Sequence, residues 1–225
     1  MTGIRAVLFD IGDTLFGRAG GHRSIVEEAA ALGVDVTDED ARRLWAEIQA
    51  LARTPHELAK GRDLSADAHR EAWTALYSAA DVLVDGLGRA LYEREIDPAR
   101  WVPYTDTGAT LHTLARSGLR LGVVSDTGWD YRRVLARHGW LDLFDSIVFS
   151  CDHGAQKPEP ALFRTACDEL GVHPAETVMV GDNALTDGGA VLAGLSVLLL
   201  PVVEPGTRRG LDAVVRLAVG GDGTR

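Results

Sequence analysis

Cysteine and lysine are both scarce in this chain of 225 residues, which has two of each. Cys151 and Cys167 are too few for a disulfide framework or a cysteine-based zinc site, so we interpret them as small buried apolar residues of a reduced, cytoplasmic protein. Long apolar runs are absent too. The longest, 195–203, is far shorter than the roughly 18 residues of a membrane span. Asp10 interrupts the N-terminal run, so neither a membrane segment nor a secretory signal is predicted.

The chain also has no excess of basic side chains. Its 23 lysines and arginines are outnumbered by 33 acidic residues, which gives a net charge of −10. Nucleic acids and anionic membranes both select basic surfaces, so neither is expected as a partner. The hydrophobic fraction of 46% and the charged fraction of 25% are those of an ordinary globular protein. None of these quantities sets the oligomeric state.

Five short apolar runs, each bounded by glycine, proline or polar residues, predict buried strands at 6–9, 119–124, 146–150, 177–180 and 195–200. Helical patterns that end at a glycine lie between them, at 106–116, 129–138, 159–170 and 186–193. This alternation predicts an α/β fold, a Rossmann-like parallel sheet core with helices on both faces. Ligand sites in such sheets lie at the carboxyl ends of the strands.

The segment 16–100 differs from the rest, because it shows helical spacing and no convincing strand. A capping-box pattern at Thr37–Asp40 predicts a helix through residue 50, and further helices are predicted at 65–79 and 82–96. We call this segment the helical insertion and predict that it forms a domain of its own. The α/β core domain is then made of 1–15 and 101–225, with a disordered tail at 220–225.

Four polar clusters stand at or just after predicted strand ends: Asp10-Ile11-Gly12-Asp13-Thr14-Leu15, Ser125-Asp126-Thr127, Lys157-Pro158-Glu159-Pro160, and Gly181-Asp182-Asn183 with Asp187. A carboxylate at a strand tip suits a nucleophile or a metal ligand, and an acidic pair suits a hard cation. A hydroxyl and backbone N–H groups in a turn can hold a phosphate. Because the chain has 21 arginines, the use of lysine at 157 indicates that a compact ammonium is required. Taken singly, each cluster also fits a helix cap, a turn or a solvated loop.

In this order the four clusters resemble the signature of the haloacid dehalogenase-like (HAD) hydrolase superfamily, over essentially the full length. The first cluster matches the motif Asp-x-Asp-x-Thr at all but one position, and Ser125, Lys157 and Gly181-Asp182 with Asp187 match the other three. The resemblance implies a phosphatase-type member in which the helical insertion is a C1-type cap domain. It also implies a Mg²⁺ cofactor and a small phosphorylated molecule as the substrate.

The resemblance assigns the metal and the nucleophile to three positions. Asp10 is the implied nucleophile, which forms an aspartyl-phosphate and binds Mg²⁺ through its other oxygen. Asp182 and the backbone carbonyl of Gly12 are the other implied ligands.

The remaining motif residues are assigned to the phosphoryl group. Ser125 and Lys157, with Asp126 and Thr127 of the same turn, are expected to hold it, and Asp187 to orient Lys157 or a water on the metal. Phosphoryl transfer concentrates negative charge, which these cations and donors would stabilise.

Gly12 departs from the family pattern, because phosphatases of the family carry their general acid, an aspartate, at this position. General acid–base catalysis is typically worth ~10²–10⁴-fold, so alkyl phosphates should react slowly and aryl or acyl phosphates should suffer less. Asp13 can substitute as the acid or can simply stabilise a turn. His22 is another candidate donor.

Three functions remain open at this point. The first is a Mg²⁺-dependent phosphatase, and the second, motivated by Gly12, is a weak or silent relative that binds a phosphorylated ligand or a partner. The third is hydrolysis of carbon–halogen bonds, against which the acidic pair argues, because that reaction needs no cation. Arg18, His22, Arg23 and Arg62 could meet an anionic substrate or could be solvated surface.

Overall fold

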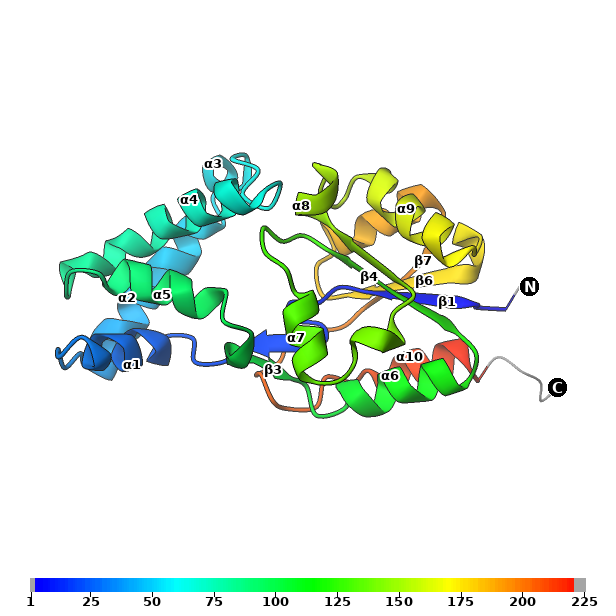
Figure 1. Cartoon of the computed structure of the whole chain (residues 1–225), viewed down its shortest axis with the longest axis horizontal. Helices are drawn as coiled ribbons and strands as arrows, with labels where there is room; N and C mark the ends of the chain where they lie inside the picture. Colours follow the sequence, from blue (N-terminus) through cyan, green and yellow to red (C-terminus); the bar gives the residue numbers. More distant parts are fainter. Residues whose placement is uncertain (1–2, 221–225) are drawn as a thin grey trace.

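The computed structural model describes residues 3–220 and contains a five-stranded parallel sheet (Figure 1). In spatial order its strands are β5 (Ser146–Phe149), β4 (Arg120–Ser125), β1 (Ala6–Phe9), β6 (Thr177–Gly181) and β7 (Ser196–Leu199). In the centre of the sheet, Phe9 of β1 is level with Val123 of β4 and Val180 of β6. The predicted α/β fold with a Rossmann-like sheet is confirmed, and the strand that leads to Asp10 lies in the middle.

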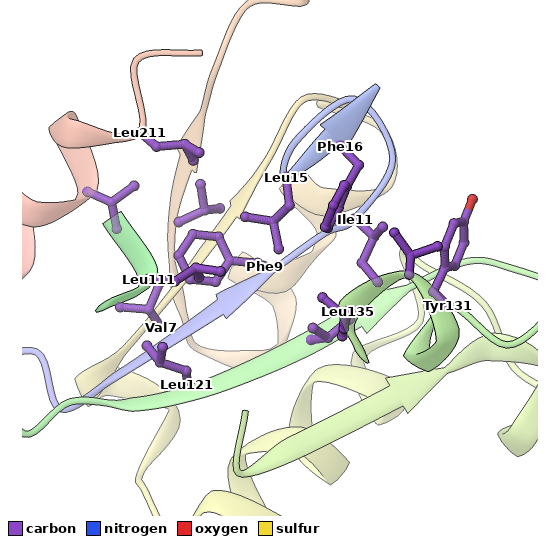
Figure 2. Packing of buried hydrophobic residues seen from close by; sticks show 14 of the residues in the cluster. Val7, Phe9, Ile11, Leu15, Phe16, Leu111, Leu121, Tyr131, Leu135 and Leu211 are labelled. Atoms are coloured by element: carbon purple, nitrogen blue, oxygen red, sulfur yellow. The ribbon is translucent and has the colours of Figure 1, made fainter. Parts of the chain in front are cut away.

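Helices cover both faces of the sheet, because the side chains of each strand point alternately to one face and to the other. In β1, Val7 and Phe9 pack on one face, whereas Ala6 and Leu8 pack on the other. Figure 2 shows the cluster around Phe9. The first face carries α6 (Thr107–Arg116), α7 (Arg132–Arg137) and α10 (Asp212–Ala218), and the second carries α9 (Pro160–Leu170) and a 3₁₀ helix (Asp187–Ala193).

The helical insertion lies between β1 and β4 and forms the left half of the view in Figure 1. It has an apolar cluster of its own, to which Ile25, Ile48, Trp73 and Leu91 contribute. The cap predicted at Thr37 is confirmed, and Ser65, the first residue of the helix predicted at 65–79, caps α4 in the same way. Both hydroxyls accept the N–H group of the residue three positions on, at 3.1 Å. Its helices are α1 (Arg23–Ala31), α2 (Asp38–Ala52), α3 (Pro55–Leu58), α4 (Ala66–Tyr77) and α5 (Leu87–Glu95).

The expectation that 16–100 contains no strand is wrong. β2 (Phe16–Arg18) pairs antiparallel with β3 (Trp101–Pro103) and forms a two-stranded ribbon where the chain enters and leaves the insertion. A three-residue strand is too short to show a periodic pattern, and its partner lies beyond the whole insertion. The predicted domain boundaries fall at this ribbon.

Three predicted helices differ in extent or type. The helix predicted over 82–96 begins only at Leu87, after a 3₁₀ turn at Ser78–Val82 and a left-handed Gly86. The helix predicted from residue 129 begins only at Arg132, because Thr127 Oγ1 accepts the N–H of Trp129 (3.1 Å) and donates to its carbonyl (2.9 Å), which favours a turn. The segment 186–193 is a 3₁₀ helix that contains Gly188 and Gly189, both poor helix formers. Helix α1 was not predicted, and its N-cap residue makes no side-chain capping bond.

Within residues 3–220, no helix is both long enough and apolar enough to cross a membrane. The predicted disordered tail lies, after Gly220, outside the described residues. The remaining segments are α8 (Ser150–His153) and 3₁₀ turns at Ser78–Val82, Pro98–Arg100, Leu141–Leu143 and Pro174–Glu176.

Candidate active site

Asp10 lies at the centre of the candidate site, directly after the middle strand of the sheet. Its N–H donates to the carbonyl of Val180 (2.9 Å), which extends the pairing of β1 with β6 by one residue and fixes the backbone. Because the carboxyl ends of β4, β1 and β6 adjoin, Ser125 and Asp182 are brought beside Asp10. All three side chains line one cavity of about 280 Å³.

Lys157 joins the polar groups at the bottom of this cavity. Its Nζ donates to Asp10 Oδ1 (2.8 Å) and to Asp187 Oδ1 (2.6 Å), and Ser125 Oγ donates to the same Asp10 oxygen (2.9 Å). Lys157 is 3% exposed and Asp187 is fully buried. Buried charges are tolerated when they are paired and hydrogen-bonded, as this ammonium is on both sides.

The two central charges perturb one another. Burial raises the pKa of Asp10 to about 6, against the opposing effect of the Lys157 ammonium. Burial would lower the pKa of Lys157, but the carboxylates of Asp10 and Asp187 hold it above its usual range. Lys157 is therefore protonated at neutral pH, and Asp10 is mostly ionised. Asp10 Oδ2 receives no hydrogen bond from any of residues 3–220, so this oxygen can react or bind a cation.

Asp187 organises the loop after β6 as well as Lys157. Its second oxygen, Oδ2, accepts the N–H groups of Asp182 and Asn183, both at 3.0 Å. Gly181 is packed so closely on Asp187 that a Cβ at this position would overlap the carboxylate. Asp187 thus acts from inside the protein, and Asp182 is the member of the acidic pair that faces the cavity.

A cation fits the oxygen atoms at this end of the sheet. Carboxylate oxygens of Asp10, Asp182 and Asp187 lie within 4.8 Å of one another. Burial raises the pKa of Asp182 to about 7, and the neighbouring carboxylates of Asp10 and Asp187 add to the rise, which a bound cation would relieve. The backbone of Gly12 also borders the cavity, and none of the described residues donates a hydrogen bond to its carbonyl. A donor set made only of oxygen suits a hard cation such as Mg²⁺.

The turn after β4 holds the three residues predicted to bind phosphate. Ser125, Asp126 and Thr127 all line the cavity. The Asp126 carboxylate, whose pKa burial raises to about 6, accepts the N–H of Lys157 (2.9 Å) and so positions the lysine. The N–H of Thr127 donates to Ser150 Oγ (2.8 Å), so in this conformation it is not available to a phosphate.

The loop after Asp10 shows what the glycine at position 12 changes. A Cβ on Gly12 would have only the Trp101 ring nearby, at 3.9 Å, so a side chain can start at this position without a clash at its first carbon. Asp13 lines the cavity too, but its φ of +52° is the left-handed conformation, and its N–H donates to the carbonyl of Phe16 (2.8 Å). Arg209 Nε donates to the carbonyl of Asp13 (2.8 Å) and fixes this turn.

Comparison with known proteins identifies the family. A family model for haloacid dehalogenase-like hydrolases matches residues 4–193. The chain belongs to this family. It is 30% identical over 207 residues to the glyceraldehyde 3-phosphate phosphatase of Methanothermobacter thermautotrophicus, which covers 88% of this chain and 85% of the relative.

Solved structures show the same fold. A putative HAD-hydrolase from Bacillus subtilis bound to magnesium has a TM-score of 0.73 at 21% identity and covers 96% of this chain and 99% of its own. A 2-haloacid dehalogenase from Pseudomonas syringae pv. Tomato DC3000 has a TM-score of 0.60 at 23% identity, with the same coverage of 96% and 99%. These likenesses concern the fold of the HAD-like hydrolases and do not distinguish phosphatases from dehalogenases.

We call the groups at the carboxyl ends of the strands the floor of the cavity. The helical insertion supplies the opposite side, which we call the wall. Of the four basic residues named from the sequence, Arg18 and Arg62 lie in the wall. His22 and Arg23 do not line the cavity, and His22 Nε2 is bonded instead to Asp38 Oδ1 (2.9 Å). His22 as a proton donor is therefore not supported by its position.

Four further wall residues were not predicted: Asp63, His69, Trp73 and Glu95. Arg18 binds both oxygens of Glu95 (2.9 and 3.0 Å), and Arg62 stacks on the Trp73 ring at 4.8 Å. These residues belong to a helix or a charged loop, where the sequence looks like ordinary solvated surface. Only the docking of the insertion on the core reveals their position.

Proposed function

We propose that this HAD-like hydrolase is a Mg²⁺-dependent phosphatase that acts on a small phosphorylated metabolite through an aspartyl-phosphate on Asp10. One observation carries the proposal: carboxylate oxygens of Asp10, Asp182 and Asp187 converge within 4.8 Å beside a buried ammonium. Hydrolysis of a carbon–halogen bond has no use for a cation at the nucleophile, whereas phosphoryl transfer needs concentrated positive charge there.

In this proposal the groups of the floor divide the reaction among them. Asp10 Oδ2 attacks phosphorus, and Asp10 Oδ1, which accepts bonds from Ser125 and Lys157 in this structure, is the oxygen left to bind the cation. The Ser125 hydroxyl and the Lys157 ammonium are placed to bind the transferring phosphoryl oxygens, together with the N–H of Asp126, which has no partner among the described residues. Asp10, Asp182 and the Gly12 carbonyl would hold Mg²⁺, which supplies further positive charge to the phosphoryl group when bound.

The cavity suits a small molecule. Its volume of about 280 Å³ lies just below the usual range for ligand pockets. The relative from Methanothermobacter is named for a three-carbon phosphate, which agrees with this size. Selection among such substrates is assigned to the helical insertion, for which we keep the predicted division at 16–100. Both thiols are free, in accord with the proposed cytoplasmic location.

Gly12 favours a second candidate, a weak or silent relative that binds a phosphorylated ligand without efficient turnover. Gly12 has no side chain to protonate a leaving alkoxide. The floor itself is complete, however, since the nucleophile, the ammonium and the carboxylate cluster are all in place. We therefore propose activity rather than silence.

Hydrolysis of 4-nitrophenyl phosphate and of acetyl phosphate, with and without Mg²⁺, tests the proposal. The wild type should turn over at least one of them only with Mg²⁺, and Asp10→Asn, which keeps the volume but removes the nucleophile, should abolish turnover. An Asp10→Asn variant as fast as the wild type would refute the assignment. Binding of orthophosphate without turnover of either compound would favour the silent relative.

A further inference from the structure

We propose that Asp63, which the helical insertion places over the site, donates the proton to the leaving oxygen that Gly12 cannot supply. The inference rests on the proposed phosphatase function and deepens it. It concerns protonation of the leaving oxygen. The family carries the acid for this step at the position that is Gly12 here.

The geometry of the reaction puts the leaving oxygen on the side of Asp63. In phosphoryl transfer the attacking and leaving oxygens lie roughly in line on opposite sides of phosphorus. Asp10 attacks from the carboxyl end of the sheet, so the leaving oxygen points to the opposite wall, which the helical insertion forms. Asp63 is part of that wall.

The backbone of Asp63 is fixed to the catalytic core. Ser150 Oγ, at the start of α8, donates to the carbonyl of Asp63 (2.5 Å) and accepts the N–H of Thr127 (2.8 Å). The same hydroxyl therefore joins the loop that carries Asp63 to the turn that carries Ser125. Ser150 is fully buried, so water does not compete for these bonds.

The carboxyl group of Asp63 is free to act on a ligand. None of residues 3–220 donates a hydrogen bond to its oxygens, and the nearest nitrogen atoms of basic side chains are Arg62 Nε at 3.7 Å and His69 Nε2 at 4.0 Å. Its side chain is 24% exposed. Burial raises the pKa of this carboxyl, against the opposing charges of Arg62, Lys157 and Arg18, and the Glu95 carboxylate adds to the rise. A raised pKa brings a carboxylic acid nearer to the range that suits a proton donor at neutral pH.

The other titratable groups near the leaving oxygen are not suited to donate the proton. Both oxygens of Glu95 accept bonds from Arg18, and one also accepts the hydroxyl of Tyr77 (3.1 Å). Burial lowers the pKa of His69 to about 4, so this ring is neutral and a poor acid. Asp13 belongs to the floor, where its charge acts on Asp182 at the cation side of the cavity.

The proton balance closes over the two halves of the reaction. In the first half, Asp10 Oδ2 forms a bond to phosphorus, the ester P–O bond breaks, and the Asp63 proton moves to the leaving oxygen, which departs as an alcohol. In the second half, the oxygen of a water molecule forms a bond to phosphorus, the bond between phosphorus and Asp10 Oδ2 breaks, and the water gives a proton to the Asp63 carboxylate. Phosphate then leaves, and both Asp10 and Asp63 return to their starting forms.

The test compares two leaving groups, phenyl phosphate and 4-nitrophenyl phosphate, in wild type and Asp63→Asn. Loss of a general acid should lower kcat/KM for phenyl phosphate by ~10²–10⁴-fold and much less for 4-nitrophenyl phosphate, whose leaving group needs little protonation. Asp67→Asn, an exposed acid of the same insertion, is the control and should leave both rates unchanged. Thermal unfolding verifies that each variant is folded.

Rescue separates a proton donor from a residue that only shapes the wall. In the double variant with Gly12→Asp and Asp63→Asn, the acid is restored at the family's position, where a Cβ meets no clash, and hydrolysis of phenyl phosphate should recover at least about tenfold over Asp63→Asn. An equal loss on both esters in Asp63→Asn, or a loss selective for phenyl phosphate in Asp13→Asn instead, would overturn the inference.

Failure of the proposed function gives a different result. If the wild type hydrolyses neither ester, or if Asp10→Asn remains active, the phosphatase assignment fails and the role of Asp63 fails with it. If Asp10→Asn is inactive and Asp63→Asn shows no preference between the esters, only the role of Asp63 is refuted.

Discussion

Replacement of Gly181 by alanine should disrupt the site without removing any charged group. A Cβ at position 181 would overlap the Asp187 carboxylate and lie 2.7 Å from the Asp187 Cβ. Asp187 is fully buried and is held by Lys157 and two backbone N–H groups, so it has no free space to move into. The methyl group must therefore push it away from at least one of these donors.

The magnitude follows from two costs. Forcing one extra carbon into a packed interior costs about 1–3 kcal/mol. Losing one hydrogen bond to a charged group costs about 1.5–3 kcal/mol more. We expect Gly181→Ala to lower the free energy of unfolding by about 2.5–6 kcal/mol, which is a fall of ~5–24 °C in Tm for a chain of this size. Turnover should fall as well, because Lys157 loses one of its two carboxylate partners.

Gly188→Ala is the matched control for this experiment. Gly188 lies one residue after Asp187, and a Cβ there would meet no atom within 4 Å. Thermal unfolding followed by circular dichroism, with Mg²⁺-dependent turnover of 4-nitrophenyl phosphate, should separate the two variants clearly. If Gly181→Ala unfolds at the temperature of Gly188→Ala and keeps wild-type turnover, Asp187 is not the rigid anchor described above.

Two further predictions concern closure and the cation. Gly128→Ala should prevent the helical insertion from docking on the core, because the new Cβ would overlap the His69 side chain and lie 2.9 Å from the carbonyl oxygen of Ser65. We expect KM to rise while Tm changes little. An unchanged KM would contradict this. Burial raises the pKa of Asp10 to about 6 and that of Asp182 to about 7, so the folded metal-free protein binds extra protons and should lose stability as pH rises from about 4 to about 7. Mg²⁺ needs both groups ionised and should therefore raise Tm more at about pH 8 than at about pH 5, whereas equal rises would be the contrary result.

The sheet could be predicted from the sequence because its strands are short apolar runs bounded by glycine, proline or polar residues. The run that ends at Asp10 is an example, since Ala6 and Leu8 pack on one face and Val7 and Phe9 on the other, which requires four apolar residues in succession. The prediction that all five are buried is wrong for β7, an edge strand that is partly exposed. The β2–β3 ribbon could not be predicted in this way. Its three-residue strands are defined by pairing with each other across the insertion, and that is a property of the fold rather than of the local pattern.

The candidate site also has a part that could be predicted from the sequence and a part that could not. The floor was predictable, since Asp10, Ser125 and Asp182 follow strands whose carboxyl ends must meet, and Lys157 stands out in a chain that otherwise uses arginine. The wall was not, because the register of a helical insertion against a sheet leaves no periodic signal. Asp63 is a charged loop residue in the sequence, and only the bond from Ser150 to its carbonyl shows where it is held.

The ribbon also has a consequence for how such enzymes diversify. The chain leaves the core along β2 and returns along β3, with Arg18 directly opposite Trp101. The two ends of the insertion are thus held side by side, so a different helical segment with adjacent ends can be grafted at this point without altering the order of the sheet strands. Mutation and recombination can then exchange the part proposed to select the substrate, and Asp63 with it, while the nucleophile and the carboxylate cluster are inherited intact. A chimaera made at Arg18 and Trp101 would carry the specificity of the donor and the nucleophile of the recipient.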